Sequence, residues 1–111
     1  MRITMVKKRL KDGHECRKCG QVTQILQERG YWDRIDEVVW ADEADERSPG
    51  MQLAARHNIQ TAPFFIVQEG DSERVYTSVV QLMQACFQRA PTLLEQLEEQ
   101  ARNAPDDPGM P

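Results

Sequence analysis

Two cysteines of this chain, Cys16 and Cys19, are separated by only two residues, and a third, Cys86, lies far along the sequence. A pair at this spacing is suited to disulfide exchange or to metal binding, and both uses require deprotonated thiols. An odd number of cysteines with one short spacing is unlike the disulfide framework of a small secreted protein. The cysteines therefore predict a redox or metal-binding pair in a reducing compartment.

The cysteine pair ends a basic segment. Residues 1–18 carry seven basic side chains and two acidic ones, a balance of +5, whereas the whole chain has a net charge of −4. The segment contains no aromatic residue on which a base could stack, so nucleic acid is not an expected partner. Arg17 and Lys18 are expected to stabilise a thiolate at Cys16, with Glu15 opposing them.

No part of the sequence suggests a membrane segment. No apolar run approaches the roughly 18 residues that a transmembrane helix needs. Residues 1–10 hold a short apolar stretch between basic residues, with no signal-type hydrophobic region after it. A cytoplasmic location is therefore expected, and a length of 111 residues suits a single domain.

The spacing of apolar residues predicts a strand, a helix and a strand in the first part of the chain. The alternation over 3–10 predicts the first strand, and apolar residues three and four apart predict a helix over 19–29 that stops at Gly30. The segment 35–41, with Val38, Val39 and Trp40 as a continuous apolar run, is typical of a central strand buried on both faces. Cys16 then lies at or just before the first turn of the helix.

The position of the cysteines on this helix predicts their roles. Unpaired N–H groups and the helix dipole favour negative charge at a helix amino terminus. We therefore expect Cys16 to be the exposed nucleophile and Cys19, one turn further on, to be the more buried resolving thiol.

Turn and capping signals divide the rest of the chain. Ser48 and Pro49 predict a helix start, with an N-cap hydroxyl followed by a proline, and Asn58 is a plausible end. The apolar face of this helix is expected to hold Met51, Ala54, Ala55 and Ile59. Three further elements are predicted, namely a strand over 64–67, a hairpin return strand over 75–77 and a helix over 79–90. A capping box opens an added helix over 92–103, so the domain spans 1–103, and 104–111 is expected to be disordered.

Several side chains near these elements are expected to be structural. Cys86 shares a helix face with Leu82 and Met83, which favours a buried thiol without a redox role. His57 lies off the apolar face of its helix and is expected to be solvated. Trp40 is expected to pack in the interior.

The order strand–helix–strand–helix–strand–strand–helix, with Cys16-Arg17-Lys18-Cys19 after the first strand and Thr61-Ala62-Pro63 before the third, resembles the thioredoxin superfamily. It is most similar to glutaredoxin-like proteins. The resemblance implies an α/β fold with a βαβαββα core, in which helices flank a central mixed four-stranded sheet.

The resemblance also implies the activity, a thiol–disulfide oxidoreductase that needs no cofactor. By the same resemblance Pro63 follows a cis peptide bond and lies beside the dithiol, and Ala62 offers backbone hydrogen bonds to an incoming peptide or thiol. Glutaredoxins carry a Gly-Gly after the hairpin, where this sequence has Thr77-Ser78. Protein disulfides are therefore the favoured partners over low-molecular-weight thiols such as glutathione, and a monomer or weak dimer is expected.

Two other functions stay open on the sequence. His14, Cys16 and Cys19 supply three metal ligands, and a closed zinc site would need His57 as the fourth. An iron–sulfur cluster shared between two chains would take two thiolates from each. A third class of function is a non-catalytic interaction module whose groove near Pro63 binds a partner without turnover.

Overall fold

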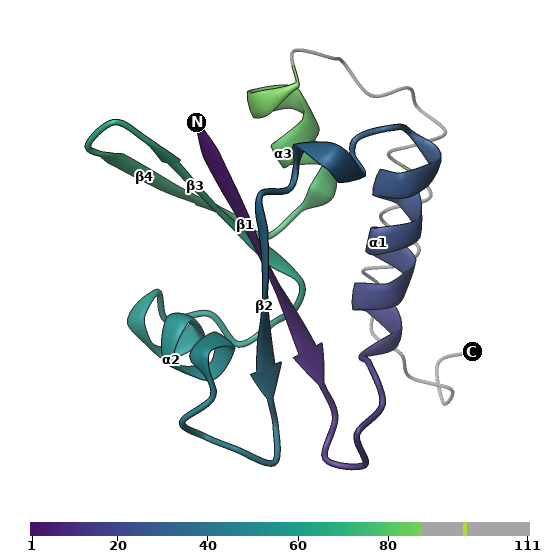
Figure 1. The fold of residues 1–111 in the computed structure, drawn as a ribbon, viewed down its shortest axis with the longest axis vertical. Coiled ribbons are helices and arrows are strands. Elements are labelled where there is room, and N and C mark those ends of the chain that lie inside the picture. Colours follow the sequence, from purple (N-terminus) through teal and green to yellow (C-terminus); the bar gives the residue numbers. More distant parts are fainter. Residues whose placement is uncertain (88–96, 98–111) are drawn as a thin grey trace.

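The computed structural model describes residues 1–87 and Leu97, and in this part of the chain one mixed sheet carries helices on both faces (Figure 1). The elements are β1 (Arg2–Arg9), α1 (Arg17–Glu28), the short 3₁₀ helix η1 (Trp32–Arg34), β2 (Glu37–Asp42), α2 (Pro49–Arg56), β3 (Phe64–Glu69), β4 (Ser72–Tyr76) and α3 (Val79–Cys86). None of the described helices is long and apolar enough to cross a membrane.

The sheet has the strand order β2-β1-β3-β4. β1 pairs parallel with β2 and antiparallel with β3, and β3 and β4 form an antiparallel hairpin. The parallel pair is joined by α1, as a crossover between parallel strands requires, and α2 lies in the connection from β2 to β3. This order and these directions make the fold thioredoxin-like, with the βαβαββα core expected from the sequence.

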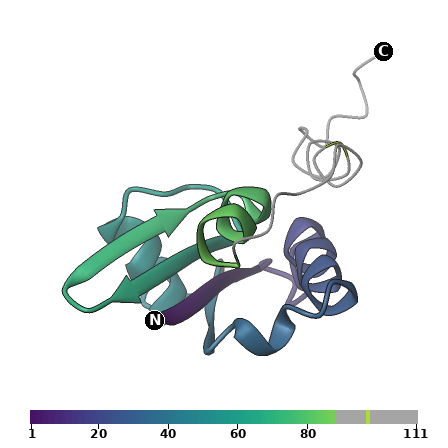
Figure 2. The same ribbon diagram turned by 90° about the horizontal axis from the view of Figure 1, so that it is seen from above.

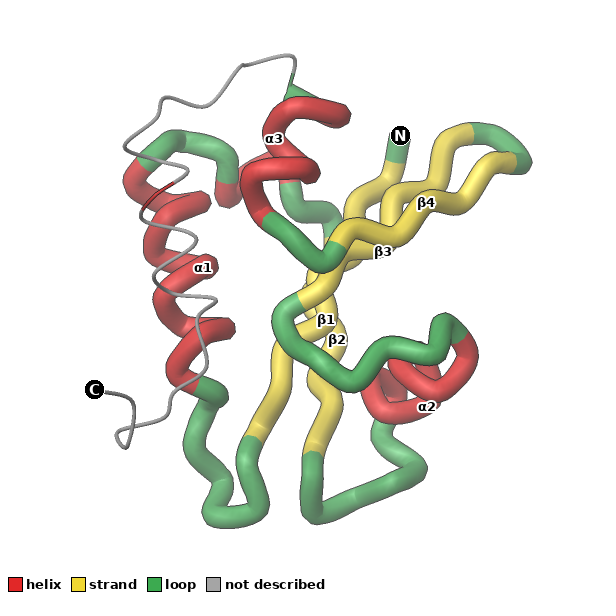
Figure 3. The backbone as a smooth tube through the Cα atoms, turned by 180° about the vertical axis from the view of Figure 1, so that it is seen from behind, coloured by secondary structure: helices red, strands yellow, loops and turns green. Residues whose placement is uncertain are grey.

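The two faces of the sheet bury different side chains, because successive residues of a strand point to opposite sides. α1 and α3 cover one face and α2 covers the other (Figures 2 and 3). The core on the α1 face consists of Ile3, Met5, Val22, Leu26, Phe65, Val67, Val79 and Leu82. The core on the α2 face consists of Val6, Ala41, Phe64 and Ile66, with half-buried residues of α2 packed against it.

The expected central strand over 35–41 was placed wrongly, because β2 is an edge strand of the described sheet and β1 is central. The apolar residues Val38 and Val39 are half-buried. The ring of Trp40 lies under two cations, with the Lys7 ammonium 4.9 Å and the Arg9 guanidinium 4.6 Å from its centroid. Basic side chains on β1 thus cover the ring of Trp40 on this edge strand.

The ends and the inward face of the later helices also differ from the prediction. Ser48 precedes α2 as expected, but its hydroxyl accepts a hydrogen bond of 2.9 Å from the Asp42 backbone N–H and does not cap the helix. Leu53 packs on the core below α2, whereas Ala55, predicted on that face, is exposed.

The last described helix, α3, ends at Cys86, four residues before the predicted end. The expected added helix over 92–103 and the tail over 104–111 lie outside the described residues, except for Leu97, which is helical.

Candidate dithiol site

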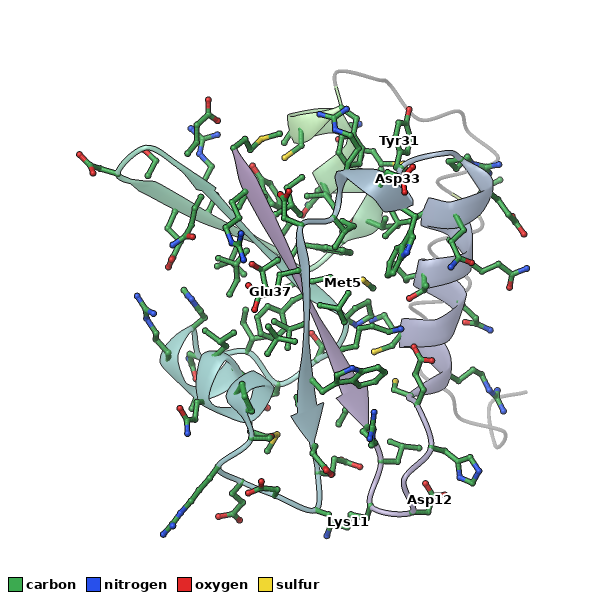
Figure 4. All side chains as sticks on the ribbon, in the orientation of Figure 1. Met5, Lys11, Asp12, Tyr31, Asp33 and Glu37 are labelled. Carbon is green, nitrogen blue, oxygen red and sulfur yellow. The ribbon has the colours of Figure 1, made fainter. Side chains whose placement is uncertain are left out.

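A tight loop carries the chain from the end of β1 to the start of α1 and fixes the position of Cys16. The Leu10 N–H donates to the carbonyl of His14 at 2.7 Å, and Gly13 adopts the positive φ of 90° that this turn requires. The Cys16 N–H donates to the carbonyl of Lys8 at 2.8 Å. Cys16 is thereby held against the end of β1, and the loop at Lys11 and Asp12 projects at that end of the molecule (Figure 4).

Cys16 and Cys19 approach each other to 3.9 Å as free thiols. Cys16 is the N-cap of α1 and is half-buried, less accessible than the sequence suggested. Cys19 is fully buried at 0% exposure. The two sulfurs are thus close enough for exchange between them, and only Cys16 is accessible to a partner.

The Cys19 thiol is strongly held in its protonated form. Burial raises its pKa to about 12, and the neighbouring Cys16 adds to that rise. The Lys8 backbone N–H, which donates to the Cys19 sulfur at 3.3 Å, and the charge of Lys7 act in the opposite direction. At neutral pH Cys19 is therefore a thiol that must lose its proton before it can attack a disulfide.

Lys7 is a site residue that the sequence reasoning missed. Its side chain is only 8% exposed, and its ammonium group forms an ion pair with the Glu15 carboxylate. A signal was present, because Lys7 continues the alternation of Ile3 and Met5 toward the buried α1 face.

The two basic residues between the cysteines lie in the first turn of α1. Arg17 is exposed and Lys18 is half-buried. Their expected stabilisation of a Cys16 thiolate stays a prediction.

The segment before β3 carries the residues expected to dock a substrate. The Ala62–Pro63 peptide bond is cis, Pro63 is buried and Ala62 is half-buried. Ala62 lines a mainly apolar pocket of about 340 Å³ between α2 and the ends of β1 and β2. Lys8 lines the same pocket and its N–H meets the Cys19 sulfur, so one residue of β1 borders both the pocket and the dithiol.

The ligand set considered for an intrachain metal site is not assembled. Within residues 1–87, no three side chains of histidine, cysteine, aspartate or glutamate come together in a way that could hold a metal ion. His14 is exposed, and its Nδ1 lies 3.2 Å from an oxygen of Asp12. The prediction that His57 is solvated was wrong, since its side chain is only 15% exposed and lies beside Glu73.

Cys86, at the end of α3, is half-buried where full burial was expected. Burial raises the pKa of its thiol. Burial therefore disfavours the thiolate of this third cysteine, as it does that of Cys19, and Cys86 is in no disulfide.

Comparison with known proteins gives a match to a solved structure and none to a family model or a curated protein. No protein-family model matches the chain, and no curated protein matches it. The structure is similar to the solution structure of a thioredoxin from Thermus thermophilus, with a TM-score of 0.39 and 21% sequence identity over 67% of this chain. The match spans 58% of that thioredoxin, less than two thirds of its length.

Proposed function

We propose that this protein is a thiol–disulfide oxidoreductase in which Cys16 attacks a substrate disulfide and Cys19 completes the exchange. The observation that carries the proposal is the asymmetry of the pair. Two free thiols lie 3.9 Å apart at the start of α1, one half-buried and the other fully buried. Exchange by two cysteines needs this combination of an accessible attacking sulfur and a protected second one.

The first step forms a mixed disulfide. The Cys16 thiolate attacks one sulfur of the substrate disulfide, the substrate S–S bond breaks, and the second substrate sulfur leaves as a thiolate that takes up a proton. The N–H groups of the first turn of α1 favour the negative charge on Cys16 before the attack. Arg17 and Lys18 add positive charge in the same turn.

The second step releases the substrate. Cys19 loses its proton, and its thiolate attacks the Cys16 sulfur, which forms the Cys16–Cys19 disulfide and frees the remaining substrate thiolate. The substrate gains two electrons and two protons in total. A dithiol or low-molecular-weight thiol donor then reduces the protein disulfide and completes the cycle.

The pocket beside Ala62 supports a polypeptide as the substrate. Its lining is mainly apolar and it borders the end of β1 against which the dithiol is held, so a side chain next to a substrate cysteine has a place to dock. In this assignment Ala62 and Pro63 receive the backbone of the partner. The corresponding preference is for protein disulfides over glutathione, and the activity requires no bound cofactor.

The composition supports a setting in the cytoplasm, where glutathione and thioredoxin systems keep such dithiols reduced. In that setting the protein acts as a monomer or weak dimer, with no role for nucleic acid or a membrane.

The test is turnover of a protein disulfide. Reduction of insulin by a dithiol donor is measured with wild type, with Cys16→Ser and with Cys86→Ser as a matched control that also removes one thiol. We expect wild type and Cys86→Ser to accelerate the reaction equally, and Cys16→Ser to give only the rate of the donor alone. Wild type that is no faster than Cys16→Ser would overturn the proposal in favour of a binding module.

A further inference from the structure

Lys7 is the most deeply buried charged side chain of the described residues. Lysine is almost never buried without a partner, because removing its charge from water costs several kcal/mol. Here the ammonium group is paired with Glu15 and lies 4.9 Å from the ring centroid of Trp40. The protein therefore maintains a positive charge at one defined point on the α1 face of the sheet.

Contacts on both sides place that point beside the resolving cysteine. Lys8, the residue after Lys7, donates its N–H to the Cys19 sulfur at 3.3 Å, and the Glu15 carboxylate that pairs with Lys7 lies 3.8 Å from where a Cβ would stand at Gly20, the residue after Cys19. The charge of Lys7 lowers the pKa of Cys19, against the larger effect of burial. The other groups that act on this thiol are the Lys8 N–H, which also favours its thiolate, and Cys16, which opposes it. Glu15 neutralises part of the Lys7 charge, and Arg9 adds a second cation over the ring of Trp40.

We propose that Lys7, held by Glu15 and Trp40, is a positioning residue that sets the rate of the resolving step by stabilising the Cys19 thiolate as it forms. The inference rests on the proposed function. As Cys19 gives its proton to water or to the departing substrate thiolate, negative charge develops on a sulfur that is closed off from solvent. The Lys7 ammonium supplies a counter-charge that solvent cannot supply there.

The effect should appear in the rate of the resolving step, in which Cys19 attacks, and not in the rate of the initial attack by Cys16. The reacting species is the thiolate, so a change in its population at Cys19 changes the second step, whereas the first step uses Cys16. Loss of the Lys7 charge should slow the resolving step about three- to tenfold, because the smaller thiolate fraction is partly offset by its greater nucleophilicity.

The experiment resolves the two steps in time. Reduced protein is mixed with dithiobis(nitrobenzoate) in a stopped-flow instrument, in a Cys86→Ser background, and the coloured thiolate is followed at a series of pH values. Attack by Cys16 gives a phase that depends on reagent concentration, and attack by Cys19 on the mixed disulfide gives a second, first-order phase. The first-order rate is the quantity compared.

Four variants test the electrostatic role. Lys7→Met should lower the first-order rate about three- to tenfold at each pH below about 9, and Lys7→Arg should restore most of it. Lys11→Met, which removes a charge from the exposed loop of the same basic segment, should leave the rate unchanged. Glu15→Gln should raise the rate, because Lys7 then acts on Cys19 without its neutralising partner.

The opposite rate changes expected for Lys7→Met and Glu15→Gln distinguish an electrostatic role of Lys7 from a packing role. If Lys7 only supports the fold, Lys7→Met and Glu15→Gln both slow the reaction or both leave it unchanged, and either result overturns the inference. Should Lys7→Met fail to fold, as judged by circular dichroism, the direction of the rate change in Glu15→Gln still tests the inference. Lys7→Arg, which keeps the positive charge, should then have a rate close to that of wild type. Wild type that shows no first-order phase would instead overturn the proposed function itself.

Discussion

The two faces of the sheet differ in how completely they are closed. On the α1 face the side chains of β1 and β3 are buried by α1 and α3, with Tyr31 and Phe87 stacked at 4.5 Å on its margin. On the α2 face one short helix covers part of the sheet and leaves cavities of about 340 and 440 Å³ over the strands, whereas the cavities on the α1 side, of about 370 and 420 Å³, lie at its margin beside Met1 and Cys86. Cys19 and Lys7 belong to the closed face, and the pocket beside Ala62 to the open one.

The two faces can therefore have different functions. A closed face excludes water and strengthens the effect of a single charge on a buried thiol. An open face can receive a side chain of a partner. β1 serves both faces, since Lys7 points to the closed one, whereas Lys8 lines the open pocket and donates its N–H to Cys19.

The largest difference between the faces should appear when the same substitution is made in each. Leu26→Ala removes a side chain with 0% exposure from the α1 face and should lower the free energy of unfolding by about 2–5 kcal/mol. Leu53→Ala, on the half-covered face, should cost about 1 kcal/mol, because the site is already open to water. Urea unfolding of both variants measures the two costs, and equal costs would contradict the distinction between the faces.

The close approach of α2 to the sheet gives the next largest effect. A Cβ at Gly50 would lie 2.3 Å from the backbone nitrogen of Ala41, so Gly50→Ala should destabilise by about 2–3 kcal/mol. The control is Gly20→Ala in α1, where the nearest atom would be 3.8 Å away. The free energy of unfolding of that variant should rise by about 0.5–1 kcal/mol, because alanine has a higher helix propensity than glycine. Thermal unfolding measures the expected loss of stability in Gly50→Ala and the expected gain in Gly20→Ala. A Gly50→Ala variant as stable as wild type would mean that α2 does not pack as described.

The buried thiol should make stability depend on pH. The pKa of Cys19 is about 12 in the folded protein and near 9.0 in the unfolded chain, so between these values only the folded state keeps the proton. Folding stability is therefore complete below about pH 9 and falls as the pH rises toward 12, by about 1.4 kcal/mol per pH unit from this group.

A matched variant isolates this contribution. Under reducing conditions, the difference in unfolding free energy between wild type and Cys19→Ala should shrink above about pH 9. Other groups titrate in both proteins and cancel in the difference. A difference that stays constant up to about pH 11 would show that Cys19 is not closed off on the α1 face.

Much of the architecture was accessible from the sequence because local signals and topology rules agree. The apolar periodicity predicted the two strands of the hairpin, and the position of Cys16 at the start of a helix followed from the residues after it. Connection rules make the first two strands parallel and the hairpin antiparallel, as observed, but they left the edge position of β2 open.

The parts that the sequence did not reveal depend on contacts between distant residues. Trp40 was assigned to a central strand because the side chains that cover its ring are cations on β1, 31 to 33 residues away in the sequence. Ser48 looked like a cap, although its hydroxyl serves the end of β2. The role of Lys7 depends on its position on the buried α1 face of β1. The alternation of Ile3 and Met5 indicates that face, whereas the net charge of the segment does not.

The most direct measurement of the central claim is trapping of the mixed disulfide. Cys19→Ser and Cys16→Ser are each incubated, in a Cys86→Ser background, with an oxidised peptide disulfide, and the products are identified by intact mass and peptide mapping. We predict that Cys19→Ser accumulates a covalent adduct at Cys16, that Cys16→Ser forms almost none, and that wild type releases the peptide and gains a Cys16–Cys19 disulfide. Equal adducts on both single-cysteine proteins, or no internal disulfide in wild type, would contradict the assignment of an attacking and a resolving thiol.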